Sequence, residues 1–384
     1  MNIPYAKQSI DKSDIDAVVK VLKADFITQG PQIPLFEKQW TEYTGAKYAV
    51  VVSSATAALH LSVLALGANS DTVVWTSPNS FVASANCALY AGAKIDFVDI
   101  NPKTLNLCEI ALEEKLKTET VKPDIVIPVH FSGQSPRIEK IHALSQQYGF
   151  KIIEDASHAI GASRNGIKVG ACQNSEMTVF SLHPAKIITS GEGGVILLND
   201  QRLHQKLIRL RQHGITRDPA LFQYPQMGSW YYEQQELGYN YRITDLQCAL
   251  GSSQLKRADR FVTRRTQIAH RYQSELKGVH LTLPSIDPEN HSSWHLFVVH
   301  LQLEAISFSH REVFEALRSA GILVNLHYIP IHLQPYYQKL GFKRGQFPHA
   351  ENHYQRAISL PLFPQLKDQE IDFVIHKIRE ILVK

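Results

Sequence analysis

Cysteine is scarce in this chain, and the four that are present do not form a recognisable framework. Cys87, Cys108, Cys172 and Cys248 are far apart in the 384 residues and form no CxxC pair. This spacing disfavours a zinc site and a set of disulfides, so we expect buried, reduced thiols. The 18 histidines include no HExxH motif or other close pair at ligand spacing, and we predict no metal site.

Long hydrophobic runs and a strong charge bias are also missing. No apolar stretch approaches the roughly 20 residues needed to span a bilayer, and the N-terminus lacks a basic segment followed by an apolar one. The formal charge of +4 is small for this length, and the basic residues are spread out. We therefore expect a cytoplasmic protein without a membrane or nucleic-acid partner, for which a small anionic substrate remains possible.

The sequence contains neither a GxGxxG nor a Walker-type motif, which disfavours Rossmann and P-loop nucleotide sites. Short β-branched runs bounded by turn residues recur instead through the first two-thirds of the chain, and helical patterns separate most of them. This alternation predicts an α/β fold with a mainly parallel, doubly wound sheet. The seven predicted strands fall within residues 48–52, 72–76, 94–100, 124–130, 150–155, 177–182 and 194–198.

The pattern changes near residue 250. One long helix, or two in succession, starts at Thr244, and the chain after it mixes short strands with amphipathic helices. We predict a large α/β domain over residues 1–250, and over residues 251–384 a connecting helix with a small C-terminal α+β domain.

Two other amphipathic segments matter for possible partners. A helix capped by Ser13 would set apolar residues on one face, which we expect to pack on the body: Ile15, Val18, Val19 and Leu22. The basic run "RLHQKLIRLRQHGITR" has leucines at helical spacing. It therefore predicts a solvated amphipathic helix rather than a nucleic-acid patch.

Two motifs are compatible with a phosphorylated, cationic ligand. Ser54, Ala55 and Thr56 follow the first strong strand and open a helix, where backbone N–H groups and the helix dipole favour an anion. An ordinary helix cap is the alternative. Asp155 ends a strand at the edge where ligands of open α/β folds bind, and its carboxylate could hold a cationic ring nitrogen. From these residues alone, a capping aspartate followed by a core-facing His158 is the commoner interpretation.

The third motif is "VFSLHPAKIITSGEGG", residues 179–194. Ser181 closes an apolar strand, Lys186 follows His183 and a proline, and Gly191 to Gly194 turn the chain into the next strand. A lysine in this place is a solvated loop residue, a phosphate-binding lysine, or the residue that carries a cofactor.

In this order and at this spacing, the three motifs resemble those of the DegT/DnrJ/EryC1/StrS aminotransferases, a family of fold-type-I pyridoxal-phosphate enzymes. The similarity runs almost end to end, through "ITQGPQIPLFEKQW", "PVHFSGQ", "IIEDASHAIGA" and "LGYNYRITDLQCALGSSQL". It is strongest to the family's transaminases of pseudaminic acid biosynthesis, through "SPNSFVASANCALYAGAKIDFVDI" and "NLHYIPI".

The resemblance implies a role for each cofactor contact. Lys186 would bond to pyridoxal 5′-phosphate and move protons between the substrate and the cofactor, and Asp155 would keep the pyridine nitrogen protonated. Phe81 would stack on the ring, and His158 stands near the ring oxygen where many relatives have glutamine. Asn240 would reach the phosphate of the neighbouring subunit, which implies a homodimer with shared active sites. The other implied phosphate contacts are Ser54, Ala55, Thr56 and Ser181.

The implied reaction transfers an amino group from glutamate, which leaves as 2-oxoglutarate, to C4 of a UDP-linked 4-keto-6-deoxy-N-acetylhexosamine. The cofactor would alternate with pyridoxamine phosphate. Arg242 is the candidate for the donor's carboxylate, since a guanidinium pairs with one bidentately. The implied substrate contacts are Tyr5, Asp25, Phe26, Ile27, Thr28, His183, Asn325, Leu326, His327 and Tyr328.

Four alternatives stay open. The substrate could be another nucleotide-linked 4-keto-6-deoxy sugar. A sugar dehydratase of the same fold is disfavoured, because in that branch histidine replaces the lysine found here as Lys186. A non-catalytic cofactor-binding regulator would not need an amine at that place. An α/β nucleotide-binding protein without this cofactor would stay colourless when pyridoxal phosphate is added.

Overall fold

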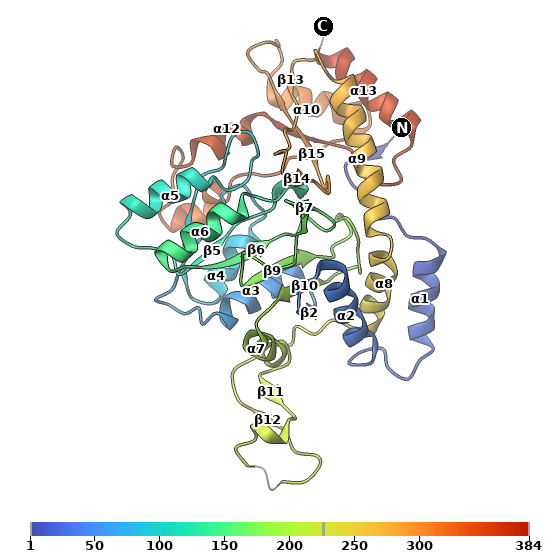
Figure 1. The fold of residues 1–384 in the computed structure, drawn as a ribbon. Coiled ribbons are helices and arrows are strands. Elements are labelled where there is room, and N and C mark those ends of the chain that lie inside the picture. The colour runs from blue at the N-terminus through green and yellow to red at the C-terminus, as the bar shows by residue number, and fades with distance from the viewer. Residues whose placement is uncertain (1, 225–226, 383–384) are drawn as a thin grey trace.

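The computed structural model describes residues 2–224 and 227–382, and its centre is a seven-stranded sheet (Figure 1). Each strand lies within a range predicted from the sequence. Only β10 runs antiparallel to its neighbours, and all the others share one direction. The predicted doubly wound α/β sheet is therefore confirmed. In spatial order the strands are β2 (Tyr48–Val52), β10 (Gly194–Leu198), β9 (Met177–Ser181), β6 (Lys151–Asp155), β5 (Ile125–Ile127), β3 (Val73–Thr76) and β4 (Lys94–Phe97).

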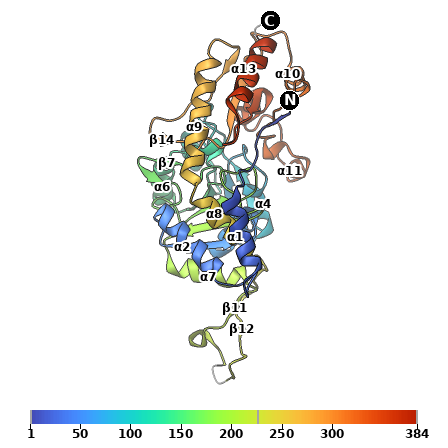
Figure 2. The ribbon, with the colours of Figure 1, turned by 90° about the vertical axis from the view of Figure 1, so that its right-hand side faces the viewer.

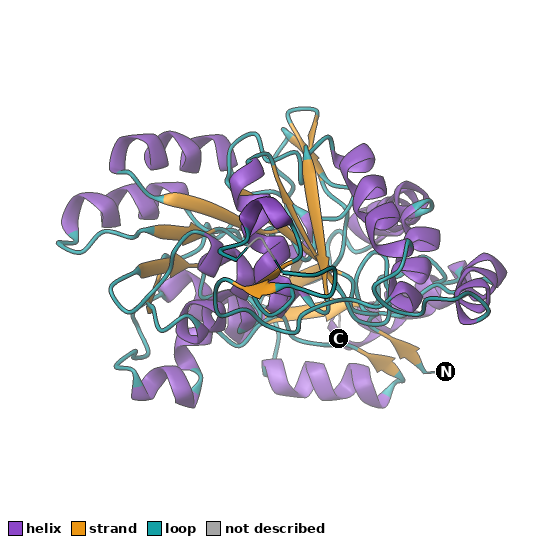
Figure 3. Cartoon of the chain, turned by 90° about the horizontal axis from the view of Figure 1, so that it is seen from below, coloured by secondary structure: helices purple, strands orange, loops and turns teal. Residues whose placement is uncertain are grey.

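Helices cover both faces of this sheet, so that the strands lie enclosed between them (Figure 3). The helices α3 (Ala55–Ala65), α4 (Ala83–Tyr90) and α7 (Gln201–Arg211) share one apolar core with the strands. The opposite face packs against α2 (Gln32–Thr44), α5 (Glu109–Thr118), α6 (Ile138–Tyr148) and α8 (Asp245–Leu255). Because β9 and β10 are buried along their whole length, they appear in the sequence as runs without a charged residue.

The chain leaves the large sheet through two successive helices, α8 and then α9 (Ala258–Glu275), which Figure 2 shows one above the other beside α13 (Asp368–Leu382). A smaller sheet follows, with β15 (Phe297–Leu301) between β13 (Leu281–Thr282) and β17 (Ala357–Leu360). The predicted domain boundary at residue 250 falls inside α8 and stays a prediction.

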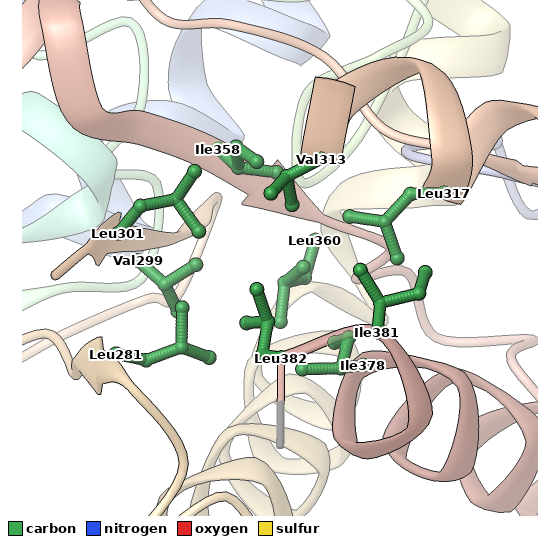
Figure 4. Close-up of a pocket in the computed structure, with 10 residues that line it drawn as sticks. All are labelled: Leu281, Val299, Leu301, Val313, Leu317, Ile358, Leu360, Ile378, Ile381 and Leu382. Carbon is green, nitrogen blue, oxygen red and sulfur yellow. The ribbon is translucent and has the colours of Figure 1, made fainter. Parts of the chain in front are cut away.

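The small sheet and its helices enclose an aliphatic core of their own (Figure 4). The space left between these side chains is about 10 Å³, roughly the room for one water molecule, so this part of the molecule is filled rather than hollow. The residues shown are Leu281, Val299, Leu301, Val313, Leu317, Ile358, Leu360, Ile378, Ile381 and Leu382.

Short elements complete the fold. The N-terminal strand β1 (Ile3–Pro4) pairs with β16 (Ile322–Leu323), which brings the start of the chain to the C-terminal part. The helices α10 (His310–Ser319), α11 (Pro335–Lys339) and α12 (Pro348–Arg356) lie in that part too. The remaining elements are β7 (Ser163–Arg164), β8 (Ile167–Lys168), β14 (Asn290–His291), β11 (Ile215–Thr216), β12 (Glu233–Gln234), and the 3₁₀ turns Phe131–Gly133, Pro219–Leu221 and Ile331–Leu333.

The N-terminal helix α1 (Lys12–Leu22) differs from its prediction. Its cap is Asp11 rather than Ser13, because the Asp11 carboxylate accepts the backbone N–H groups of residues 13 and 14. The helix packs on the body as predicted, against α8, but the predicted apolar face is not the one that packs, and the buried apolar residue is Val21. Asp14 is buried too, and it accepts a hydrogen bond from Gln254 at 2.7 Å and pairs with Arg257. Ile15, Val19 and Leu22 are therefore exposed, and Val18 is partly buried.

A hairpin-like arm built on β11 and β12 projects from the body below α7 (Figures 1 and 2). Its apolar side chains are solvent-exposed in the single chain, Trp230 by 75% of its surface. The others are Leu221, Tyr224, Met227, Tyr232 and Leu237.

Two predictions from composition can be compared with the structure. All four cysteines are free thiols, and Cys87, Cys172 and Cys248 are buried as expected. Among the helices of the described residues, none is both long enough and apolar enough to cross a bilayer.

Candidate active site

A cavity of about 520 Å³ opens at the carboxyl ends of the central strands. Its volume is typical of a small-molecule site. The three sequence motifs, which span residues 54 to 194, meet in its wall, and the segment 325–328 closes it from the C-terminal part. Fourteen predicted residues line it: Tyr5, Ser54, Ala55, Thr56, Phe81, Asp155, His158, Ser181, His183, Lys186, Asn325, Leu326, His327 and Tyr328.

The start of α3 forms one end of the cavity. Ser54 caps the helix, and its Oγ accepts the N–H of Ala57 at 3.1 Å. Gly194 approaches this turn so closely that a Cβ there would lie 2.3 Å from the Ser54 carbonyl oxygen and 2.7 Å from the Ala55 nitrogen. Only glycine allows that approach, and it brings β9, with Ser181 opposite Gly194, against the helix N-terminus. The result is a backbone-lined cradle at a positive helix end, which suits a phosphate.

Asp155 ends β6 at the floor of the cavity and is buried. Its Oδ1 accepts the Ser157 hydroxyl at 2.6 Å and the Ser157 N–H at 3.1 Å, and its Oδ2 accepts the Ser84 hydroxyl at 2.6 Å. This carboxylate therefore has a fixed orientation.

Lys186 lies in the loop between β9 and β10, which is tied down at Leu182. The Leu182 N–H donates to Gly193 at 2.9 Å, and the Leu182 carbonyl accepts from the Thr189 hydroxyl at 2.8 Å and the Ser190 N–H at 3.1 Å. The loop thus holds the lysine in a defined place. Burial lowers the pKa of Lys186 to about 8, while the carboxylate of Asp155 acts in the opposite direction.

The lowered pKa of Lys186 predicts a pH dependence for the cofactor-free protein. Only the neutral amine is nucleophilic, and its fraction rises as the pH increases through about 8. The rate at which Lys186 bonds to added pyridoxal phosphate, followed by absorbance, should rise with a midpoint near pH 8. A midpoint near 10.4, the value of an ordinary lysine, would contradict this account of the site.

His158 is buried beside Asp155, but its ring nitrogens already have partners. Nδ1 accepts the Ser132 N–H at 3.3 Å, which leaves the proton on Nε2, 3.1 Å from the Tyr328 hydroxyl. Burial, and secondly the charge of Lys186, hold the pKa of His158 well below its ordinary value. The neutral ring therefore supports Tyr328, and its predicted contact with the cofactor ring oxygen stays a prediction.

The C-terminal wall of the cavity is uncharged and, apart from Leu326, polar. Burial, with a smaller effect of Lys186, lowers the pKa of His327 to about 3, and its Nδ1 lies 2.7 Å from the Ser359 hydroxyl. Tyr5 and Asn325 line the same side. Neutral imidazole, hydroxyl and amide groups are suited to sugar hydroxyls.

Several lining residues were missed by the sequence analysis. His295, whose ring centroid lies 4.4 Å from that of His158, comes from the C-terminal part, and no local pattern marks it. The sequence could have indicated Ser157, because it follows a strand-end aspartate by two residues. The remaining missed residues are Leu59, Ser80, Ala83, Val129, Ala185 and Glu192.

Six predicted residues do not line the cavity of the single chain. The segment 25–28 is exposed and joins the start of α8, where the Asp245 N–H donates to the Ile27 carbonyl at 3.0 Å. Asn240 is exposed on the strand-like bridge to Gln212, and Arg242 is partly buried. The roles of Asp25, Phe26, Ile27, Thr28, Asn240 and Arg242 stay predictions.

Comparison with known proteins decides the family. The model of the DegT/DnrJ/EryC1/StrS aminotransferase family matches residues 8–379. The chain belongs to this family. The aminotransferase is 37% identical to the UDP-4-amino-4,6-dideoxy-N-acetyl-β-L-altrosamine transaminase of Campylobacter jejuni over 383 residues, 100% of this chain and 98% of that protein. It is also 37% identical to the spore coat polysaccharide biosynthesis protein SpsC of Bacillus subtilis, over 99% of this chain and 97% of SpsC.

Solved structures agree with this assignment. Helicobacter pylori PseC, an aminotransferase of pseudaminic acid biosynthesis, superposes with a TM-score of 0.91 and 31% identity, covering 100% of both chains. The pyridoxal-phosphate form of the putative sugar aminotransferase Spr1654 from Streptococcus pneumoniae has a TM-score of 0.90 and 27% identity, covering 99% of this chain and 98% of that one.

The aminotransferase is a pyridoxal-phosphate enzyme, and its cavity fits that cofactor. The cradle kept open by Gly194 would hold the phosphate. Asp155 would contact the ring nitrogen, and Phe81 would cover one face of the ring. Ala55 is the first helical residue of α3, so the helix itself leaves its backbone N–H without an intrahelical acceptor.

Proposed function

We propose that this aminotransferase moves an amino group from glutamate to C4 of a UDP-linked 4-keto-6-deoxy-N-acetylhexosamine in pseudaminic acid biosynthesis. One observation carries the proposal: Lys186, Asp155 and a neutral polar wall line the same cavity. The name of the Campylobacter relative supports the choice of sugar.

When bound, the cofactor supplies an electron-accepting ring, and it carries the amino group from one half-reaction to the other. The other steps belong to side chains of this protein. Asp155 would hold a proton on the pyridine nitrogen, and Phe81 would pack on the ring. The Lys186 amine removes the α-proton of glutamate and later delivers a proton to C4 of the sugar. Burial lowers the pKa of this amine to about 8, closer to neutral pH than that of an ordinary lysine, which suits an acid–base catalyst.

The wall made by Tyr5, Asn325, His327 and Tyr328 would bind and orient the sugar. Because Lys186 reaches C4 from one side, the face that this wall presents to Lys186 would set the stereochemistry of the new amine. The segment 325–328 joins β16 to the small sheet, since the Ser359 N–H donates to the Asn325 carbonyl at 2.8 Å. The wall would therefore be rigid enough to select one face.

The second candidate is the same reaction on another nucleotide-linked 4-keto-6-deoxy sugar. The chain is as similar to SpsC as to the Campylobacter transaminase, at 37% identity each, which supports this second candidate. One methyl or hydroxyl changes binding by only about 1–3 kcal/mol. The test incubates the protein with glutamate and a panel of UDP-4-keto-6-deoxy-N-acetylhexosamine isomers and identifies the product by NMR. Amination of the pseudaminic acid precursor is expected, and amination of none of them would refute the proposal.

The proposal includes a cytoplasmic homodimer with shared active sites. Free thiols are typical of a reducing compartment. The exposed apolar residues of the arm and the outer face of α1 are typical of surfaces covered by another protein, here a second copy. Asn240 would reach the partner's cofactor phosphate, and Arg242 would bind the donor's carboxylate.

Mixed dimers test the sharing of sites. Asn240→Asp would set a carboxylate against the partner's cofactor phosphate, and Lys186→Ala removes the amine, so either variant alone should be nearly inactive. Mixing the unfolded subunits and refolding them should restore about a quarter of the wild-type activity, because half of the dimers then hold one intact site. No restoration, with dimers formed, would contradict shared sites.

A further inference from the structure

The two oxygens of the Asp155 carboxylate are not equivalent. Oδ1 accepts two hydrogen bonds from Ser157, at 2.6 and 3.1 Å, whereas Oδ2 accepts one from Ser84 at 2.6 Å. A carboxylate oxygen has two lone pairs, so Oδ1 is fully used and Oδ2 keeps one acceptor position. The pyridine N–H of the cofactor would therefore share Oδ2 with Ser84.

Ser84 is fully buried in the first turn of α4, and its hydroxyl has a second serine beside it. The Ser80 Oγ lies 2.7 Å away and is buried too. Ser84 has a single O–H, and a carboxylate is a stronger acceptor than a hydroxyl. Ser84 thus donates to Asp155, and Ser80 donates to Ser84.

The hydrogen bond between the Ser80 and Ser84 hydroxyls spans the turn that presents Phe81, and a backbone hydrogen bond closes the same turn. Ser80 precedes Phe81, and the Ser84 N–H donates to the Phe81 carbonyl at 3.3 Å. The Phe81 side chain is 60% exposed, and the nearest ring, that of Tyr328, has its centroid 6.5 Å away. The position of Phe81 therefore depends on its backbone rather than on tight side-chain packing.

We propose that Ser84, supported by Ser80, is a positioning residue for the cofactor. Its hydroxyl holds Oδ2 of Asp155 toward the ring nitrogen, and the Ser80–Ser84 hydrogen bond holds the turn from which Phe81 covers the ring. The proposal concerns cofactor binding and does not depend on which sugar is aminated.

The test measures the dissociation constant of pyridoxamine phosphate by fluorescence titration of the cofactor-free protein. Ser84→Ala should raise this constant roughly tenfold or more, since a hydrogen bond to a charged group is lost. It should also shift the visible absorbance of the loaded enzyme and lower kcat, with the KM for the keto sugar unchanged. Ser84→Thr, which keeps the hydroxyl, should restore the affinity, and Ser80→Ala should show a smaller effect in the same direction.

Ser145→Ala is the matched control. Ser145 is a buried helical serine in α6 whose hydroxyl donates only within its helix, to the His142 carbonyl at 2.8 Å. The dissociation constant of pyridoxamine phosphate for Ser145→Ala should equal that for the wild type. An equal shift in the Ser84 and Ser145 variants, or none in the Ser84 variant, would overturn the proposal. If Ser84→Ala does not fold, an unchanged constant in Ser80→Ala overturns it. Failure of the wild type to aminate any sugar would count against the proposed function only.

Discussion

Replacing Lys186 by alanine is expected to reduce transamination by about 10²- to 10⁴-fold or more, the usual contribution of an acid–base group. The loss arises because no other amine lines the cavity formed by the described residues. The variant should still bind pyridoxamine phosphate, since Asp155 and the cradle at the start of α3 remain. Activity is measured as 2-oxoglutarate formed, and binding by fluorescence titration.

The control for Lys186→Ala is Lys151→Ala. Lys151 opens β6 at the end of the sheet away from the cavity, and its side chain is exposed in an ion pair with Glu176. This variant should keep wild-type activity. Retained turnover in Lys186→Ala itself would show that another group moves the protons.

Replacing Asp155 by asparagine is expected to produce the second large loss. Asparagine keeps the shape and can still accept a hydrogen bond from Ser84 or Ser157, but it lacks the negative charge that holds a proton on the ring nitrogen. We expect the dissociation constant of the cofactor to rise about 10- to 100-fold, as for loss of a charge-assisted hydrogen bond of about 1.5–3 kcal/mol. The rate constant kcat should fall as well, because an unprotonated ring accepts electrons poorly.

Asp124→Asn provides the comparison for this variant. Asp124 precedes β5 at the amino ends of the parallel strands, on the side of the sheet away from the cavity, and its carboxylate accepts the Val73 N–H at 2.8 Å. Its replacement should affect stability and leave cofactor affinity unchanged. Equal cofactor affinity of Asp155→Asn and the wild type would exclude a charged contact with the ring.

The sheet was predictable because most of its strands are buried on both faces. Runs such as residues 177–182 and 194–198 have no charged residue to interrupt them. The helical patterns between most of the other runs favour parallel strands, whereas the glycine turn before residue 194 leads into the one antiparallel strand. The strand-end positions of Asp155 and Ser181 then follow, since parallel strands bring their carboxyl ends to one edge. Their roles came from the resemblance to the family and not from the spacing itself.

Other features depend on contacts between distant residues. The outward apolar face of α1 could not be foreseen, because Asp14 is buried through Gln254 and Arg257, over 200 residues later in the chain. His295 enters the cavity through the packing of the C-terminal part. The sequence predicts Gly194 only as part of a turn, because its close approach to Ser54 arises from the pairing of β10 with β2 and β9.

The most direct test of the central claim, that this cavity transfers an amino group through Lys186, uses glutamate alone. The purified, cofactor-loaded protein is mixed with glutamate in the absence of any sugar, and 2-oxoglutarate is measured per subunit. About one equivalent should form, with loss of the visible absorbance, because the donor half-reaction needs no acceptor. Formation of 2-oxoglutarate only after a keto sugar is added would contradict the account.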